Sequence, residues 1–141
     1  MILILDFGSQ YTQLIARRVR EAKVYSEIHS NKITFEEVKQ FNPAGIILSG
    51  GPMSVYDIDA PDIDEQILKI GIPILGICYG LQLICKKSGG KVEPAKDREY
   101  GRAILSVVDA SPLLADVNKQ SKVWMSHGDY LTELPAGFKI I

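Results

Sequence analysis

Apolar segments alternate with helix-like segments along residues 1–90. The opening run at 2–7 is almost entirely apolar and lacks the polar alternation of a half-exposed strand. Such a run is typical of a strand buried on both faces of a parallel sheet. Further strands are expected at 24–29, 45–50 and 72–76, with helix-like segments between them. Repeated alternation of strand and helix predicts a doubly wound, mostly parallel α/β sheet.

The first two connecting segments carry clear helix signals. Segment 10–22 places its apolar residues at helical spacing and its arginines mostly elsewhere, as in an amphipathic helix. Before the second helix, Thr34 and Glu37 form the pattern of a capping box. Ile33 is placed to contact Val38 across this helix start.

The two later helices are predicted from similar signals. Asp62 and Glu65 resemble another capping pair at the start of a stripe of isoleucines. The members of the stripe are Ile63, Ile67 and Ile70. The helix after the fourth strand should direct Leu81, Ile84 and Cys85 toward the core.

The last third of the chain has a different pattern. Short strands follow one another at 91–94, 102–108 and 122–126, which predicts antiparallel strands at an edge of the sheet. The residues from Gly137 to Ile141 resemble the opening of a further strand. We therefore expect residues 1–141 to be one domain that lacks its C-terminal part.

Composition fits a globular domain without narrowing its function much. The 141 residues are 46% hydrophobic and 23% charged, with a net charge of −1. Dispersed basic residues argue against nucleic acid or a membrane surface as the main partner. The sequence shows neither the pattern of a signal peptide nor a run long enough to span a bilayer, so the cytoplasm is the expected location. Cys78 and Cys85 are seven positions apart on one expected helix, about 10 Å, which is too far for a disulfide.

Cys78 is the strongest candidate for chemistry. It lies between Gly76 and Gly80, where the fourth expected strand turns into a helix. This is the pattern of a nucleophile elbow with cysteine in place of serine, and the positive end of the helix would face a thiolate. A lone cysteine is more often a small buried hydrophobe. The flanking glycines and the strand context reverse that preference.

Three features should meet beyond the carboxyl ends of the strands, where ligands bind in open parallel sheets. They are Ser9-Gln10, Gly50-Gly51-Pro52 and Cys78. Backbone amides from the Gly-Gly turn and from Tyr79 would supply two donors to one oxyanion. A plain turn is an equally good interpretation of the glycines taken alone, and a phosphate loop is not, because the Lys-Ser/Thr of that motif is missing.

A general base is harder to find. His29 ends the second expected strand and resembles a surface residue, whereas His127 is the better candidate for lying near the crevice. Asp129 could orient His127, although a structural role in the loop is the simpler interpretation. We expect no metal, because no cluster of His, Cys and Asp has ligand spacing.

Five segments in order resemble the glutamine amidotransferase domains of GMP synthetases. They are DFGSQYTQLIARRVRE at 6–21, GIILSGGP at 45–52, GICYGLQ at 76–82, REYG at 98–101 and WMSHGD at 124–129. The cysteine elbow and SGGP occur in class I glutamine amidotransferases generally, whose fold is flavodoxin-like. The first and last segments point to the GMP synthetase group.

The resemblance implies a mechanism and a set of site residues. Cys78 would attack the side-chain amide of glutamine, with the backbone amides of Gly51 and Tyr79 holding the oxyanion. Ammonia would leave a thioester that water hydrolyses. Gln82 and the segment Ser126, His127 and Gly128 would hold the amino-acid end of glutamine.

The resemblance also implies partners. Ammonia would pass to a synthetase domain or subunit that uses ATP and Mg²⁺ to aminate XMP to GMP, with no cofactor in residues 1–141 themselves. The parent protein could pair as a homodimer. The base of the family is a His-x-Glu motif downstream of SHGD, and 1–141 does not contain it, so His127 is not assigned as the base. We therefore expect these residues alone to hydrolyse glutamine poorly or not at all.

Two other interpretations stay open at this point. The domain could be a non-catalytic interaction or regulatory module that docks on a synthetase. It could also be another α/β hydrolase with a cysteine elbow, such as a peptidase-like relative, although the SHGD segment and the position of Gln82 argue against this. The reactivity of Cys78 toward a glutamine analogue separates the amidotransferase from the non-catalytic module.

Overall fold

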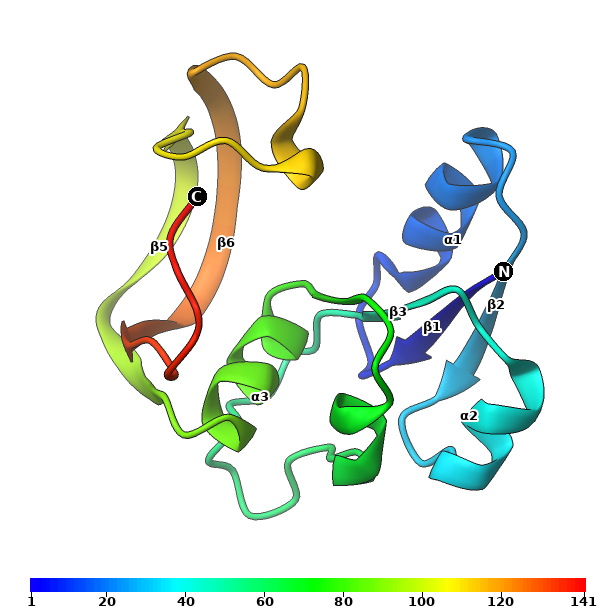
Figure 1. The fold of residues 1–141 in the computed structure, drawn as a ribbon. Coiled ribbons are helices and arrows are strands. Elements are labelled where there is room, and N and C mark those ends of the chain that lie inside the picture. Colours follow the sequence, from blue (N-terminus) through cyan, green and yellow to red (C-terminus); the bar gives the residue numbers. More distant parts are fainter.

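The computed structural model describes the backbone of residues 1–141 and every side chain except those of 95–100 and 126–127. Four parallel strands form one sheet in the order β2-β1-β3-β4 (Figure 1). These strands are β1 (Ile2–Asp6), β2 (Ser26–Ser30), β3 (Gly45–Leu48) and β4 (Ile74–Gly76). The predicted doubly wound, mostly parallel sheet is confirmed.

Helices cover both faces of this sheet. They are α1 (Thr12–Glu21), α2 (Phe35–Phe41), the 3₁₀ helix η1 (Glu65–Lys69) and α3 (Tyr79–Lys87). In Figure 1, α1 lies on one face, and α2, η1 and α3 lie on the other. This division follows from right-handed crossovers, because the strand order reverses direction after β2. Among the described helices, none is long and apolar enough to cross a membrane.

The core is centred on β1, which pairs with β2 on one side and β3 on the other. Leu3 and Leu5 are completely buried and belong to the main apolar cluster, which also contains residues of α2, η1 and α3. The intervening Ile4 is completely buried too, as is Ala16 of α1. Burial of successive residues explains why the opening run of the sequence shows no polar alternation.

The start of α2 matches its sequence signal. Thr34 accepts a hydrogen bond from the backbone amide of Glu37 at 3.3 Å, and the Glu37 carboxylate accepts one from the amide of Thr34 at 2.8 Å. This is the reciprocal pair of a capping box. Ile33 and Val38 are both buried in the main cluster.

The third predicted helix differs from expectation. It is a five-residue 3₁₀ helix, and its cap is Asp64, which accepts from the amide of Gln66 at 3.0 Å. Asp62 is therefore not the cap. Its carboxylate is paired with Lys87 at 3.0 Å and accepts from the amide of Ile63, so a long-range ion pair replaces the expected local role.

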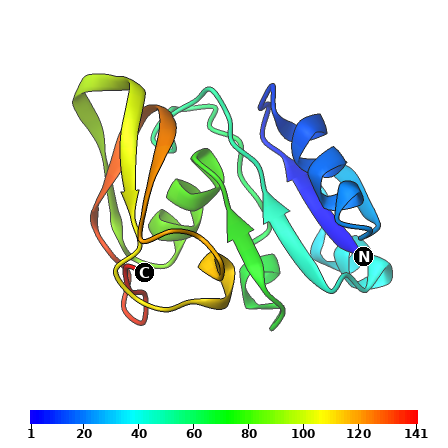
Figure 2. The same ribbon diagram turned by 90° about the horizontal axis from the view of Figure 1, so that it is seen from above.

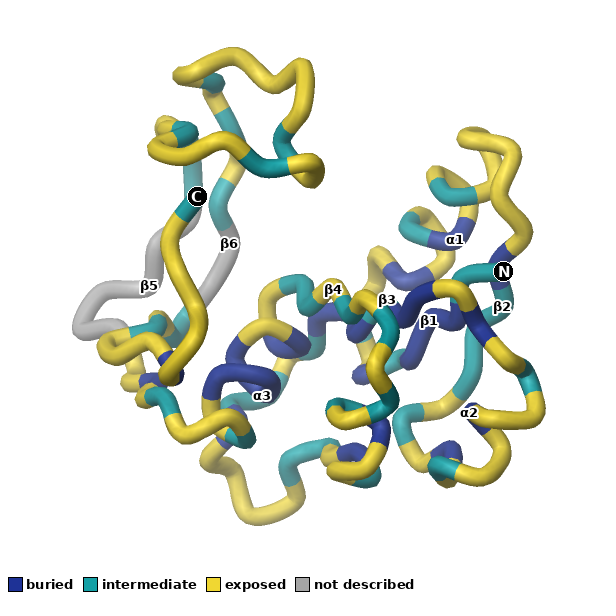
Figure 3. The backbone as a smooth tube through the Cα atoms, viewed as in Figure 1, coloured by how far each residue is buried: buried dark blue, intermediate teal, exposed yellow. Residues whose placement is uncertain are grey.

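The last third forms a separate antiparallel ribbon of β5 (Lys91–Ser106) and β6 (Gln120–Glu133). Antiparallel strands were expected, but these two pair with each other and not with β4. Viewed from above in Figure 2, the ribbon stands beside α3 at the end of the molecule opposite β2. Residues 137–141 contain no strand, contrary to expectation. Buried positions concentrate in the parallel sheet and α3, whereas the described part of the ribbon is mostly exposed or half-buried (Figure 3).

Candidate active site

Cys78 lies in a sharp turn between β4 and α3. Its backbone has φ 53° and ψ −111°, a conformation that residues with a side chain rarely adopt. The residue is exposed to solvent and immediately precedes Tyr79, the first residue of α3. The strand–turn–helix expected for a nucleophile elbow is therefore present, with a strained cysteine at its bend.

Two glycines make this turn sterically feasible. A methyl group placed on Gly76 would lie 2.6 Å from the backbone nitrogen of Leu81. One placed on Gly80 would lie 2.7 Å from Cβ of Leu48 in β3 and closer still to its carbonyl oxygen. Gly80 also donates its amide to the carbonyl of Ser49 at 3.1 Å. The helix that follows Cys78 is therefore in backbone contact with the neighbouring strand.

The three predicted features do meet at the carboxyl ends of the strands. A methyl group on Gly50 would lie 3.4 Å from Cβ of Cys78 and 3.6 Å from Oγ of Ser9. Buried Ser49 fixes this turn, because its hydroxyl accepts from the amide of Phe7 at 3.0 Å and donates to the carbonyl of Gly50 at 2.9 Å. The Gly-Gly turn thus lies directly beside the thiol-bearing residue.

The two proposed oxyanion donors come from the two segments that meet at this junction. Gly51 packs on the backbone of Phe7, where a methyl group would lie 2.6 Å from the Phe7 carbonyl oxygen. Tyr79 occupies the first position of α3, where a backbone amide has no carbonyl partner within the helix. Such an arrangement can receive negative charge that develops on an oxygen above Cys78.

The side chain of Tyr79 anchors the start of α3. It is 1% exposed, its ring centroid lies 5.3 Å from that of Phe7, and its hydroxyl donates to the carbonyl of Pro61 at 2.5 Å. Burial raises the pKa of this phenol from 10.0 to about 12, and the negative charges of Asp62 and Asp57 add to the effect.

This raised pKa predicts a loss of stability in strong alkali. The folded protein holds the Tyr79 phenol neutral more strongly than the unfolded chain does, so this contribution is complete below pH 10 and disappears as the pH rises toward 12. Between pH 10 and 12, the free energy of unfolding should therefore fall more steeply in the wild type than in Tyr79→Phe. Urea unfolding at several pH values measures the difference. Equal slopes for the two proteins would contradict the prediction.

Gln82 connects the elbow to the ribbon. Its side chain is 7% exposed, and its Nε2 donates to the carbonyl of Asp129 in β6 at 3.1 Å. This contact brings half-buried Gly128 toward α3. The predicted roles of Ser126 and His127 fall on side chains outside the described residues.

His29 is excluded as a partner of Cys78 by its place in the sheet. It lies on β2, at the opposite edge from β4, so about 14 Å of sheet separates the two strands. Its Nε2 lies 3.1 Å from a carboxylate oxygen of Glu27, and its ring packs on Phe41. His29 therefore lies near the strand end, as predicted, but β2 continues for one more residue to Ser30.

The second cysteine has a different environment. Cys85 is buried, its thiol lies 3.6 Å from the carbonyl of Glu133, and burial raises its pKa. Ile84 and Cys85 face the core as predicted. Leu81 does not, because it is 43% exposed and buried Leu83 takes the inward position. Only Cys78 of the two cysteines is accessible to a reagent in solution.

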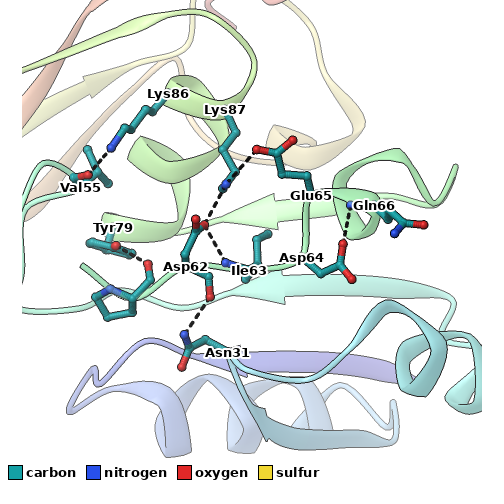
Figure 4. Close-up of polar contacts among 11 residues, drawn as sticks. Asn31, Val55, Asp62, Ile63, Asp64, Glu65, Gln66, Tyr79, Lys86 and Lys87 are labelled. Carbon is teal, nitrogen blue, oxygen red and sulfur yellow. Dashed lines mark hydrogen bonds and ion pairs between the residues drawn. The ribbon is translucent and has the colours of Figure 1, made fainter. Parts of the chain in front are cut away.

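Sequence reasoning missed the contacts between α3 and the 53–62 segment, which follows the Gly-Gly turn. Four contacts join the two, through Tyr79, Lys86 and Lys87 of the helix. Figure 4 shows the hydrogen bonds and the ion pair among them. The segment has no apolar periodicity, so no local pattern could have indicated them. Among the residues with described side chains, no group of three His, Cys, Asp or Glu could hold a metal ion.

Comparison with known families gives a match along almost the whole chain. The family model for "Glutamine amidotransferase class-I" matches residues 3–141. A GMP synthase [glutamine-hydrolyzing] of Rippkaea orientalis is 57% identical over 141 residues, which are 100% of this chain and 26% of the relative. That of Listeria innocua is 60% identical over 139 residues, 99% of this chain and 27% of the relative. The chain thus spans about a quarter of the length of these relatives.

Solved structures agree on the fold. A protein of Thermoplasma acidophilum assigned as a GMP synthase subunit superimposes with a TM-score of 0.82 and 31% identity, covering 96% of this chain and 68% of that one. A glutamine amidotransferase of Thermotoga maritima gives a TM-score of 0.72 at 24% identity, covering 96% of this chain and 63% of that one. At this lower identity the likeness supports the fold alone.

Proposed function

The chain belongs to the class I glutamine amidotransferase family, and from this premise we propose that it is the ammonia-producing domain of a GMP synthase. The observation that carries the proposal is the exposed, strained Cys78 directly beside the Gly50-Gly51 turn. A thiol held next to two sets of backbone amides is suited to attack on a carbonyl carbon. Glutamine supplies that carbonyl in its side-chain amide.

The reaction would run in two steps. The Cys78 sulfur forms a bond to the amide carbon of glutamine, and the carbonyl oxygen gains a negative charge that the amides of Gly51 and Tyr79 accept. The carbon–nitrogen bond then breaks, and the leaving nitrogen takes a proton and departs as ammonia. In the second step water adds to the thioester carbon, the carbon–sulfur bond breaks, glutamate is released, and the sulfur takes a proton from the water to restore the thiol. Gln82, Ser126, His127 and Gly128 would hold the amino-acid end of the substrate.

Within the larger protein, this ammonia would aminate XMP to GMP on a synthetase domain or subunit. That domain would bind ATP and Mg²⁺, and residues 1–141 would need no cofactor of their own. We place the reaction in the cytoplasm, in purine biosynthesis, with a homodimer formed through the parent protein. The names of the relatives and their greater length support the assignment to GMP synthesis within a larger protein.

We further propose that residues 1–141 alone turn over glutamine slowly or not at all. His29 lies at the far edge of the sheet and is paired with Glu27, so it cannot serve Cys78 as a base. His127 matches the SHGD segment of the family and not its His-x-Glu base. Covalent labelling, which does not require turnover, is therefore the direct test of the site.

A chloroketone analogue of glutamine should alkylate Cys78 at least about a hundredfold faster than Cys85, because binding orients the electrophile over an accessible thiol. Peptide mass spectrometry after timed labelling measures both rates. L-glutamine should protect Cys78, and L-glutamate should protect it much less. Cys78→Ala is the control for labelling elsewhere. Equal labelling of the two cysteines, unaffected by glutamine, would favour the non-catalytic module instead.

A further inference from the structure

The 53–62 segment is fastened to α3 by polar contacts at both of its ends (Figure 4). At its start, the Lys86 ammonium donates to the carbonyl of Val55 at 2.5 Å and lies 4.6 Å from the ring centroid of Tyr56. At its end, the Tyr79 hydroxyl donates to the carbonyl of Pro61 at 2.5 Å, and Lys87 pairs with Asp62 at 3.0 Å. The helix thus contacts both ends of a segment that has no regular structure.

Packing fixes only part of this segment, since Val55 is buried in the main apolar cluster but Ile58 is not. A cavity of about 230 Å³ lies between it and α3, lined by Val55, Ile58, Pro61, Tyr79 and Leu83 among others. Ile58, at the middle of the segment, is fully exposed. Because side chains do not fill the space under the rest of the segment, the hydrogen bonds and the ion pair at its ends act together with buried Val55 to hold it against α3.

The two fastened elements lead directly to the proposed oxyanion donors. The 53–62 segment follows Gly51 with only Pro52 between them, and the fixed φ of proline limits movement at that joint. Helix α3 begins with the amide of Tyr79, next to Cys78. A shift of the segment relative to the helix would therefore change the distance between the amides of Gly51 and Tyr79.

We propose that Tyr79 and Lys86 are positioning residues. Their side chains hold the backbone amides of Gly51 and Tyr79 at the spacing and orientation that let both donate to one oxygen. The inference rests on the proposed glutamine chemistry of Cys78. Neither side chain needs to touch the substrate. Each acts by setting the geometry of the backbone that does.

The test uses Tyr79→Phe and Lys86→Met, with Tyr25→Phe as the matched control. Tyr79→Phe removes one hydroxyl and keeps the ring, and Lys86→Met keeps most of the stem and removes the charge. Tyr25 also donates its hydroxyl in a hydrogen bond, to Glu27, but it is exposed and precedes β2 at the far edge of the sheet. Since Lys86 is exposed, its variant should fold even if Tyr79→Phe does not.

The readout is the inactivation of Cys78 by the chloroketone analogue and by iodoacetamide. The ketone oxygen gains negative charge as sulfur approaches, whereas iodoacetamide reacts by direct displacement of iodide without an oxyanion. In both variants the limiting rate of inactivation by the chloroketone should fall about tenfold. The chloroketone concentration that gives half of this rate, and the rate of reaction with iodoacetamide, should both stay within about twofold of the wild-type values. Tyr25→Phe should behave as the wild type does.

Three results would overturn the proposal. The limiting chloroketone rate could stay unchanged in both variants, it could fall only in parallel with the iodoacetamide rate, or only the half-saturating concentration could rise. Failure of the underlying function would look different. In that case the wild type itself would show no saturation with the chloroketone and no protection by glutamine, and the positioning proposal would fall with it.

Discussion

Replacing Cys78 by alanine or by glycine should abolish labelling by the glutamine analogue in both variants. The glycine variant should nevertheless be the more stable of the two. Both substitutions remove the sulfur, so at least about a thousandfold loss of covalent reaction is expected. The stability difference arises because the backbone at position 78 has φ 53° and ψ −111°. Alanine keeps the Cβ that makes this conformation costly, and glycine does not.

The expected size of this difference is set by two opposing terms. Backbone strain of this kind costs about 1–3 kcal/mol, and glycine loses about 0.5–1 kcal/mol through the greater entropy of its unfolded chain. Cys78→Gly should therefore exceed Cys78→Ala by about 1 kcal/mol in the free energy of unfolding, measured by urea titration. A variant Cys78→Gly that is less stable than Cys78→Ala would show that the elbow is not strained.

The largest loss of stability is expected from Gly80→Ala. In an ordinary helix this change is stabilising by about 1 kcal/mol, because alanine is the better helix former. Here the new methyl group would contact the carbonyl oxygen of Leu48 and lie 2.7 Å from its Cβ, and these atoms belong to a buried strand that cannot move aside cheaply. We expect a net loss of about 3 kcal/mol, measured by urea titration.

Gly50→Ala is the matched control for this substitution. It introduces the same methyl group at the same junction, but its nearest neighbour would be Cβ of Cys78 at 3.4 Å, close to an ordinary contact distance. Its free energy of unfolding should fall by less than about 1 kcal/mol. If the free energy of unfolding falls by a similar amount in both variants, the close backbone contact at Gly80 is not the reason that position 80 requires glycine.

Much of this fold could be predicted because its signals are local. Thr34 and Glu37 lie three residues apart, and a capping box needs nothing beyond that helix turn. The same reasoning failed at Asp62, because an ion pair with Lys87 across the structure determines its role, and Asp64 caps η1. At Leu81, helical spacing did not identify which face of α3 would meet the sheet.

The candidate site divides in the same way. Cys78 and its flanking glycines could be predicted because a sharp strand-to-helix turn imposes steric demands within five residues. Its proximity to Gly50 and Ser9 could also be inferred, since parallel strands end at one edge of the sheet. The anchoring of Tyr79 on Pro61 could not, because it joins residues eighteen positions apart through a segment without a periodic pattern.

Backbone contact between Gly80 and Leu48 also limits how this domain could be regulated. At Gly80 no side chain of the helix separates α3 from β3, so there is no room for the helix to shift into a second packing arrangement. We therefore expect α3 and β3 to move as one rigid body. Allosteric signals from another domain could not switch the nucleophile by displacing it. They would have to act on parts that are not locked to β3 in this way, and the 53–62 segment, which meets α3 across a cavity and through a few polar contacts, is suited to receive them.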